Sequence, residues 1–373
     1  MMHKTLYMPD RIIIEQSALS LPYTQKILGK FANIPIETVG RIHDIKKYSS
    51  NESPENVVLI TNYKGSLIKK CPGSSGVLCC NYYVANLING CPFACEYCIL
   101  QDYLNCGCVM VCSNIATFFE ELRQVVKPGY ILRLGTGELA DSLAFDYLFD
   151  LTDELIPRMH EFPDVILELK TKSDCVKNIL KYDAPGNIVI AWSLNPQELI
   201  DRYEHNATPL RNRLNAAISV VSKGYKTAFH FDPIILVPGW EKLYKQVIDE
   251  LFASVAPEHI SWISLGGLRF MPSLKRVSMD RFPQTDMFSY GEFVMCKDGK
   301  FRYFYPMRRD MYRTVAGYIH EYYPSAPVYF CMESPKMWND VFGALPTRIS
   351  DISHVYDPYP YDAICGTKFQ DGN

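Results

Sequence analysis

The most constraining feature of the sequence is a short loop that carries three cysteines in a CxxxCxxC pattern: Cys91, Cys95 and Cys98. Thiolate sulfur is the ligand that iron–sulfur clusters take, and a [4Fe–4S] cluster offers four irons for binding. Three thiolates in one loop leave one iron open to another ligand. The pattern therefore predicts a cluster with a chemical role, because a fourth cysteine would give a closed electron-transfer centre.

The alternative is a structural zinc site or a group of unrelated core cysteines. A zinc site usually needs a fourth ligand at comparable spacing. The loop follows the apolar run at residues 82–88 and precedes a predicted helix, which favours the cluster. Six more cysteines flank the loop, and the sequence leaves open whether they bind a further cluster, supply a zinc ligand or are buried thiols: Cys71, Cys79, Cys80, Cys106, Cys108 and Cys112.

The cysteine spacing, with Tyr97 just before the last cysteine, resembles the signature of radical S-adenosylmethionine (radical SAM) enzymes. The resemblance implies that the amino and carboxylate groups of SAM bind the open iron. It also implies that one electron cleaves the sulfonium of SAM to give a 5′-deoxyadenosyl radical. A protein reductant such as a flavodoxin or a ferredoxin is then an expected partner.

The composition indicates a globular protein: 48% of the 373 residues are hydrophobic and 21% are charged. The formal net charge of −3 gives no general attraction to nucleic acid, although local basic patches remain possible. Four arginines interleave with late tyrosines and form the best candidate nucleic-acid surface, so that DNA is a possible partner: Arg302, Arg308, Arg309 and Arg313.

The sequence predicts a cytoplasmic protein without a membrane partner. No signal peptide is visible, and no apolar run approaches the roughly 20 residues of a membrane span. Thirteen cysteines, an odd number, in such a chain favour reduced thiols and metal binding over a disulfide framework.

Strand and helix patterns alternate from residue 82 onward and predict an α/β fold. The predicted barrel strands are residues 82–88, 130–134, 164–170, 188–192, 227–231 and 259–265. Six such units predict a partial (βα)6 TIM-type barrel at residues 81–270. A small N-terminal α/β domain is expected at residues 1–80 and a C-terminal extension at 271–373. Catalytic residues of such barrels collect where the strands end.

The loop after the second barrel strand contains Gly135, Gly137, Glu138 and Asp141. Its glycines could let the backbone approach the methionyl amino group of SAM, with Glu138 or Asp141 accepting a hydrogen bond from that group. The alternative is an ordinary tight loop whose acids are solvated.

Polar residues also follow the next two strands. Lys172 is suited to pair with the SAM carboxylate or with a phosphate, and Ser193 and Asn195 lie at the following strand end. Each of them alone could equally be a solvated lysine or a capping group. Arg133 lies inside a strand, where a charge is rarely buried without a partner, so we expect acidic groups opposite it within the barrel.

The ordered set of motifs resembles the spore photoproduct lyase family from Arg11 to about Cys331. Beyond the cysteine loop and Leu100-Gln101, the resemblance is carried by Thr171-Lys172, Ser193-Leu194-Asn195, Gly224-Tyr225-Lys226, Asp232-Pro233-Ile234-Ile235 and Gly239-Trp240-Glu241. It implies binding of SAM and a [4Fe–4S] cluster, and action on a thymine-dimer lesion in DNA.

The same resemblance locates a departure from the family. The lyases return a hydrogen atom from a cysteine in the loop after the second barrel strand, assisted by tyrosines near the cluster motif. Glu138 occupies the place of that cysteine here, and Ile99 replaces the tyrosine after the last cluster cysteine. Tyr97 and Glu138 are therefore the predicted catalytic positions, and glutamate does not readily donate a hydrogen atom.

Three functions follow from these observations. The first is a lyase-like radical SAM enzyme that acts on a different, unidentified substrate. The second is a DNA repair lyase that recruits another donor, namely Cys106, Cys108, Cys112, Cys331 or a late tyrosine. The third is a non-catalytic metal-binding module. The missing donor favours the first function.

Overall fold

The computed structural model describes residues 7–41, 56–74, 77, 78, 80, 82–104 and 108–345. Cys79 and Cys106 lie outside these residues, as does the segment after residue 345. Within the described ranges, no helix has the length and apolar character needed to cross a membrane.

The N-terminal part forms a five-stranded sheet in the order β2-β1-β3-β8-β6, with α1 (Pro22–Leu28) beside it. Its strands are β1 (Arg11–Glu15), β2 (Ile36–Val39), β3 (Val57–Thr61), β6 (Ile88–Asn89) and β8 (Val109–Cys112). The strands β6 and β8 come from beyond residue 80, so the sheet crosses the predicted domain boundary.

The second sheet is the predicted partial barrel, with eight strands in the order β18-β14-β13-β11-β10-β9-β5-β4. All neighbours are parallel except β4 and β5. Its strands are β4 (Ile68–Lys70), β5 (Tyr83–Ala85), β9 (Leu132–Gly135), β10 (Val165–Thr171), β11 (Ile188–Ser193), β13 (Lys226–Ile234), β14 (Ile260–Gly267) and β18 (Val328–Phe330).

The six predicted barrel strands are confirmed, with one change of extent and two additions. The apolar run at residues 82–88 contains β5 and the first residue of β6, because the chain leaves the barrel after Ala85 and enters the other sheet. The edge strand β4 was missed, because three residues are too few to show a strand period. The strand β18 lies in the predicted C-terminal extension, yet it joins the barrel sheet beside β14.

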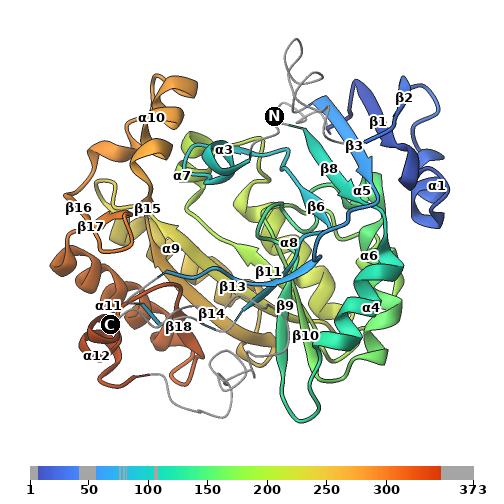
Figure 1. Ribbon diagram of the computed structural model, residues 1–373. Coiled ribbons are helices and arrows are strands. Elements are labelled where there is room, and N and C mark those ends of the chain that lie inside the picture. Colours follow the sequence, from blue (N-terminus) through green and yellow to red (C-terminus); the bar gives the residue numbers. More distant parts are fainter. Residues whose placement is uncertain are drawn as a thin grey trace, which may run out of the picture.

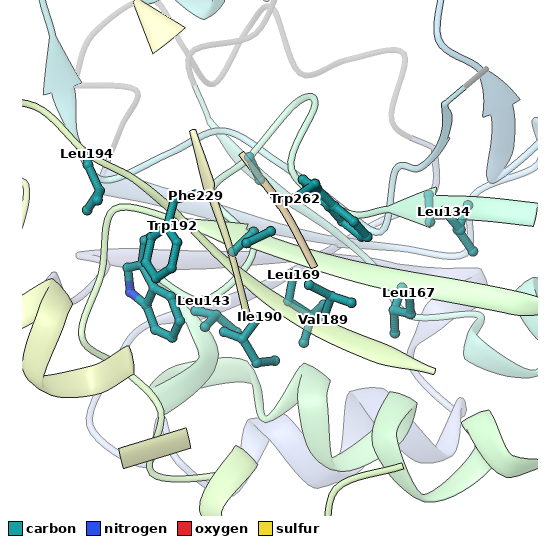
Figure 2. Close-up of a cluster of buried hydrophobic side chains, with 14 of the residues drawn as sticks. Leu134, Leu143, Leu167, Leu169, Val189, Ile190, Trp192, Leu194, Phe229 and Trp262 are labelled. Carbon is teal, nitrogen blue, oxygen red and sulfur yellow. The ribbon is translucent and has the colours of Figure 1, made fainter. Parts of the chain in front are cut away.

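Helices cover the outside of the barrel, and the N-terminal sheet lies on the opposite side from α10, α11 and α12 (Figure 1). The helices not yet named are α3 (Leu100–Tyr103), α4 (Ile115–Val125), α5 (Asp146–Phe149), α6 (Leu151–Leu155), α7 (Gln197–Tyr203), α8 (Leu210–Ser222), α9 (Trp240–Ser254), α10 (Pro272–Arg281), α11 (Tyr305–Tyr322) and α12 (Pro335–Phe342). Figure 2 shows part of the core between sheet and helices, where Trp192 stacks on Phe229.

Alternation along the strands divides the barrel residues into an apolar outer set and a polar inner set. Leu167 and Leu169 of β10 belong to the apolar core, whereas Glu168 joins a buried polar network. Its carboxylate accepts hydrogen bonds from Arg133 at 2.9 Å and bonds His230 Nε2 at 2.7 Å. The expectation of an acidic partner for Arg133 is confirmed.

The two edges of the barrel meet at a seam. Arg133 fills it, with its guanidinium 4.9 Å from the ring centre of Tyr82 and 5.2 Å from that of Tyr329. Among the described residues, one antiparallel bridge joins the edges there, in which Leu78 N donates to Glu333 O at 2.9 Å. In the described part of the chain, the edges are thus joined by side-chain contacts and this bridge.

The buried network predicts acid sensitivity. Burial, together with nearby Lys170, lowers the pKa of His230 to about 4, although Glu168 opposes this shift. In the unfolded chain a histidine titrates near pH 6.5. The unfolded state therefore binds the extra proton as the pH falls from 6.5 towards 4, and the folded state loses roughly 3 kcal/mol across this window.

Chemical denaturation at pH 7 and pH 4.5 tests this expectation. His230→Gln should remove most of the loss between the two pH values, whereas His160→Gln, at an exposed histidine, should leave the loss as in the wild type. An unchanged loss in His230→Gln would contradict the assignment.

Candidate functional site

The cysteine loop is held by main-chain contacts on both sides. Within it, β7 (Ala94–Cys95) pairs antiparallel with β12 (Glu204–His205), so that Cys95 lies opposite Glu204. The side-chain amide of Gln101 donates to the carbonyl oxygens of Cys95 at 3.0 Å and Glu96 at 3.1 Å. These contacts fix the loop at the carboxyl ends of the barrel strands.

The three cysteines line one pocket of about 150 Å³ at this end of the barrel. Five other predicted site residues line the same pocket: Gly137, Glu138, Asp141, Lys172 and Ser193. Tyr97 also lines it. Gly135 and Asn195 are not among the lining residues.

Burial raises the pKa of each of the three thiols, and the electrostatic influence of Cys98 and Cys95 raises that of Cys91 further. Lys172 acts in the opposite direction on Cys95 and Cys98. A cation beside buried thiols stabilises their thiolate forms, which are the forms that bind metal. The three side chains thus share one electrostatic environment.

The donor set fits an iron–sulfur cluster better than a single metal ion. Within the described part of the chain, no three His, Cys, Asp or Glu side chains converge closely enough to hold one ion. A [4Fe–4S] cluster binds each thiolate through a different iron, so its ligands spread around the cluster. The proposed fourth zinc ligands Cys108 and Cys112 lie in apolar cores instead.

Behind the cysteines lies a buried polar network centred on Glu204. Its carboxylate is bonded by Arg213 at 2.5 Å, by Asn195 at 2.8 Å and by the Tyr97 hydroxyl. Tyr244 donates to Asn195 at 2.8 Å. Burial alone would raise the pKa of Glu204, but Arg213, Lys172 and the hydrogen bonds lower it to about 2. Asn195 therefore supports Tyr97 from behind the pocket.

Lys172 and Asp141 have different surroundings although both line the pocket. The Lys172 ammonium lies 5.6 Å from the ring centre of Tyr97. Asp141 accepts four hydrogen bonds from its own neighbourhood: from the amides of Leu143 and Ala144, from the Thr171 hydroxyl and from the Lys172 amide. This network gives Asp141 a structural role and leaves Glu138 as the carboxylate available to a ligand.

Glu138 is partly buried in the pocket. Burial raises its pKa, while Asn86 and Lys69 oppose this shift. The amide of Asn86 lies 3.5 Å from the Glu138 carboxylate, a long hydrogen bond. A carboxyl group whose pKa is raised in a pocket can exchange a proton with a bound ligand.

A second cavity, of about 230 Å³, adjoins the first and shares Tyr97, Cys98 and Ile99 with it. It lies at the carboxyl ends of β13 and β14, where Arg269 and Asp232 form a two-contact ion pair at 2.8 and 3.0 Å. Its remaining lining residues are Pro233, Leu268, Phe270, Met271, Leu274, Lys300 and Met332.

Several residues that shape the site were not found from the sequence. Glu204 and Arg213 carry no motif that marks them, because Glu204 lies in a two-residue strand and pairs with Cys95 and Tyr97 far along the chain. Gln101 stands in the stretch that carries the family resemblance, but its contacts with the loop carbonyls were not predicted. Asp232 could have been found, because it stands at a strand end beside a proline, as the predicted site residues do.

The predicted nucleic-acid surface is wrong for two of its four arginines. Arg302 is buried against Asp298, with contacts of 2.7 and 2.8 Å, and Arg308 is buried against Glu333. Arg309 pairs with Asp310, and Arg313 donates to the Asp340 carbonyl. The alternation of tyrosine and arginine arises from a packed hairpin and helix.

A partial parallel barrel with a CxxxCxxC loop at the carboxyl ends of its strands defines the radical SAM class of enzymes. A family model described as spore photoproduct lyase matches residues 7–331. The chain therefore belongs to the spore photoproduct lyase family, and it is a radical SAM enzyme of that kind.

Known relatives agree with this assignment. The spore photoproduct lyase of Geobacillus sp. (strain Y412MC61) is 24% identical over 343 residues, which cover 87% of this chain and 98% of the relative. That of Bacillus subtilis (strain 168) is 23% identical over 346 residues, covering 86% and 98%. The fold matches a solved spore photoproduct lyase mutant with bound AdoMet and dinucleoside spore photoproduct, with a TM-score of 0.76 at 22% identity, over 87% of this chain and 100% of the other.

Gly135 was predicted to contact SAM, and a substitution tests whether the glycine is instead required for packing. A Cβ at this position would lie 1.5 Å from the hydroxyl oxygen of Tyr82. Gly135→Ala should therefore lower the unfolding free energy by about 1–3 kcal/mol, the usual cost of overpacking. Gly317→Ala is the control: nothing lies within 4 Å of its added Cβ inside α11, so it should stabilise the protein. Equal effects of the two substitutions would contradict the packing role.

Proposed function

We propose that the protein binds a [4Fe–4S] cluster through Cys91, Cys95 and Cys98 and cleaves SAM reductively, acting on a substrate other than the spore photoproduct. The observation that carries the proposal is the gathering of the three thiols, Lys172 and Glu138 around one pocket. When bound, the cluster would supply one electron to SAM and thereby generate the 5′-deoxyadenosyl radical.

The residues of the pocket have distinct roles in this proposal. Lys172 and Ser193 would hold the SAM carboxylate, while Gly137 and Glu138 would receive its amino group. The Lys172 ammonium lies over the ring of Tyr97, and the Tyr97 hydroxyl donates to Glu204. The Glu204 network that fixes Tyr97 therefore also positions Lys172. The second cavity, which shares the edge formed by Tyr97, Cys98 and Ile99, would hold the substrate. A small electron-carrier protein would reduce the cluster.

The proposal of a different substrate rests on Glu138. Among the described residues that line the two cavities, the only thiols belong to the three cluster cysteines. The Cys331 sulfur lies 3.6 Å from the Arg269 guanidinium, and Cys331 does not line either cavity. A substrate radical in the second cavity therefore meets no lining thiol from which to take a hydrogen atom.

SAM cleavage is the first test. Anaerobically reconstituted protein with a chemical reductant should bind iron and sulfide and form 5′-deoxyadenosine, measured by chromatography. Cys95→Ala should reduce this product to background, because the cluster loses one of three ligands. Cys175→Ala, at a cysteine outside both cavities, should keep it. Wild-type protein that binds a cluster but forms no 5′-deoxyadenosine would favour a non-catalytic metal-binding module.

The substrate is tested with dinucleoside spore photoproduct, the compound bound in the solved relative. We expect the wild type to cleave SAM yet release no thymidine, because Glu138 cannot return a hydrogen atom. Glu138→Cys supplies a thiol at the same place and should yield thymidine, whereas Glu138→Ala should not. Conversion of the lesion by the wild type would instead assign the DNA repair activity of the family, with another donor.

A further inference from the structure

We propose that Lys300 recognises an acidic group, a phosphate or a carboxylate, on the molecule that occupies the second cavity. The inference rests on the proposed function only in taking this cavity as the substrate site. It adds the chemical class of the substrate: an apolar body that carries one anionic group.

The apolar lining of the second cavity would contact the apolar part of the proposed ligand. Leu268, Phe270, Met271 and Leu274 line one side, between the end of β14 and the start of α10. Ile99 lines it from the side of the cysteine loop and is 46% exposed. An apolar or aromatic group placed here would lie beside Cys98, on the side of the cavity that faces the first pocket.

The charged residues that line the cavity are the ion pair of Arg269 with Asp232 and the separate cation Lys300. Arg269 is neutralised by Asp232, whose two carboxylate oxygens each accept from one guanidinium nitrogen. Burial alone would raise the pKa of Asp232, but Arg269 lowers it to about 2, so this pair stays charged and internally balanced. Two-contact pairs of this type are strong and geometrically specific.

Lys300 has no comparable partner among the described residues. Its ammonium donates to the Ser74 hydroxyl at 2.8 Å and lies 3.7 Å from the Met332 sulfur. The carboxylate of Asp298 is 3.9 Å away, and Arg302 occupies both of its oxygens. The Lys300 side chain is only 18% exposed. With Arg269 and Asp232 cancelling each other, Lys300 is the remaining cation among the described lining residues, and the nearest carboxylate, Asp298, is shared with Arg302.

An anionic ligand would provide a partner for the positive charge of Lys300. Burial lowers the pKa of Lys300, and the positive charges of Arg269 and Arg302 lower it further, while Asp298 opposes them. An ammonium has three donor positions, and the Ser74 hydroxyl takes one of them. A phosphate or carboxylate would accept a charge-assisted hydrogen bond from another, whereas a neutral group of the same shape would leave the charge uncompensated.

Two matched ligand pairs test the inference on the reconstituted protein with SAM. Thymidine 5′-monophosphate against thymidine probes a phosphate, and 3-phenylpropionate against 3-phenylpropanol probes a carboxylate. Dissociation constants are measured by ligand-observed NMR. In at least one pair, the acid should bind the wild type about tenfold more tightly than its neutral partner, as expected for a hydrogen bond to a charged group.

The variants separate Lys300 from general surface charge. Lys300→Met should abolish the preference for the acid, and Lys300→Arg should retain most of it. Lys297→Met removes an exposed lysine from the same hairpin turn and should leave the preference unchanged. The pair that shows the effect identifies the phosphate or the carboxylate as the acidic group.

Three results would overturn the inference: no preference in either pair, a preference that survives Lys300→Met, or one that Lys297→Met abolishes. The test does not depend on turnover. Failure of the wild type to form 5′-deoxyadenosine would reject the proposed function, whereas the ligand preference would still report on Lys300.

Discussion

The buried ion pair between Glu204 and Arg213 is the interaction on which the site depends. Both side chains are fully buried, and Arg213 also donates to the carbonyls of Ser193 and Thr208. Removing one partner of such a pair leaves a buried charge and typically costs about 3–5 kcal/mol. The main chain at Glu204 pairs with Cys95 while its carboxylate bonds Tyr97, so one residue positions both a proposed cluster ligand and the ring that lies 5.6 Å from the Lys172 ammonium.

Side chains alternate between the inside and the outside of the barrel along each strand, and β10 places charged residues on the inside. Inner positions of β10 carry Glu168 and Lys170, and Lys172 follows on the same side just past the strand end. The first of these belongs to the buried network with Arg133 and His230, whereas the lysines line the cysteine pocket. A single strand thus leads from the buried charge network to the cysteine pocket. Two adjoining cavities lie at the carboxyl ends of the strands, and Tyr97, Cys98 and Ile99 line both of them.

The sequence predicted the long barrel strands and the cysteine loop because both depend on local patterns. It also located Lys172 and Ser193 at the pocket, since parallel strands end at one edge. It did not predict which polar residues already have partners. Asp141 binds the backbone of its own neighbourhood, Asn195 bonds Tyr244 and Glu204, and Gly135 accommodates Tyr82. Whether a polar side chain is already paired depends on the folded geometry, and residue type and spacing do not reveal it. Arg302 pairs with Asp298, four residues away, and Arg308 pairs with the more distant Glu333, so both failed as surface predictions.

The seam of the barrel has a mechanical consequence. Neighbouring strands of the sheet are joined by ladders of main-chain hydrogen bonds, whereas among the described residues the edges are joined by the bridge between Leu78 and Glu333 and by the contacts of Arg133 with Tyr82 and Tyr329. Fewer main-chain bonds of the described residues therefore resist opening at the seam than between neighbouring strands. Glu333, which makes the bridge across the seam, directly follows Met332, which lines the second cavity. The closure of the barrel and one wall of that cavity thus depend on the same short segment of main chain.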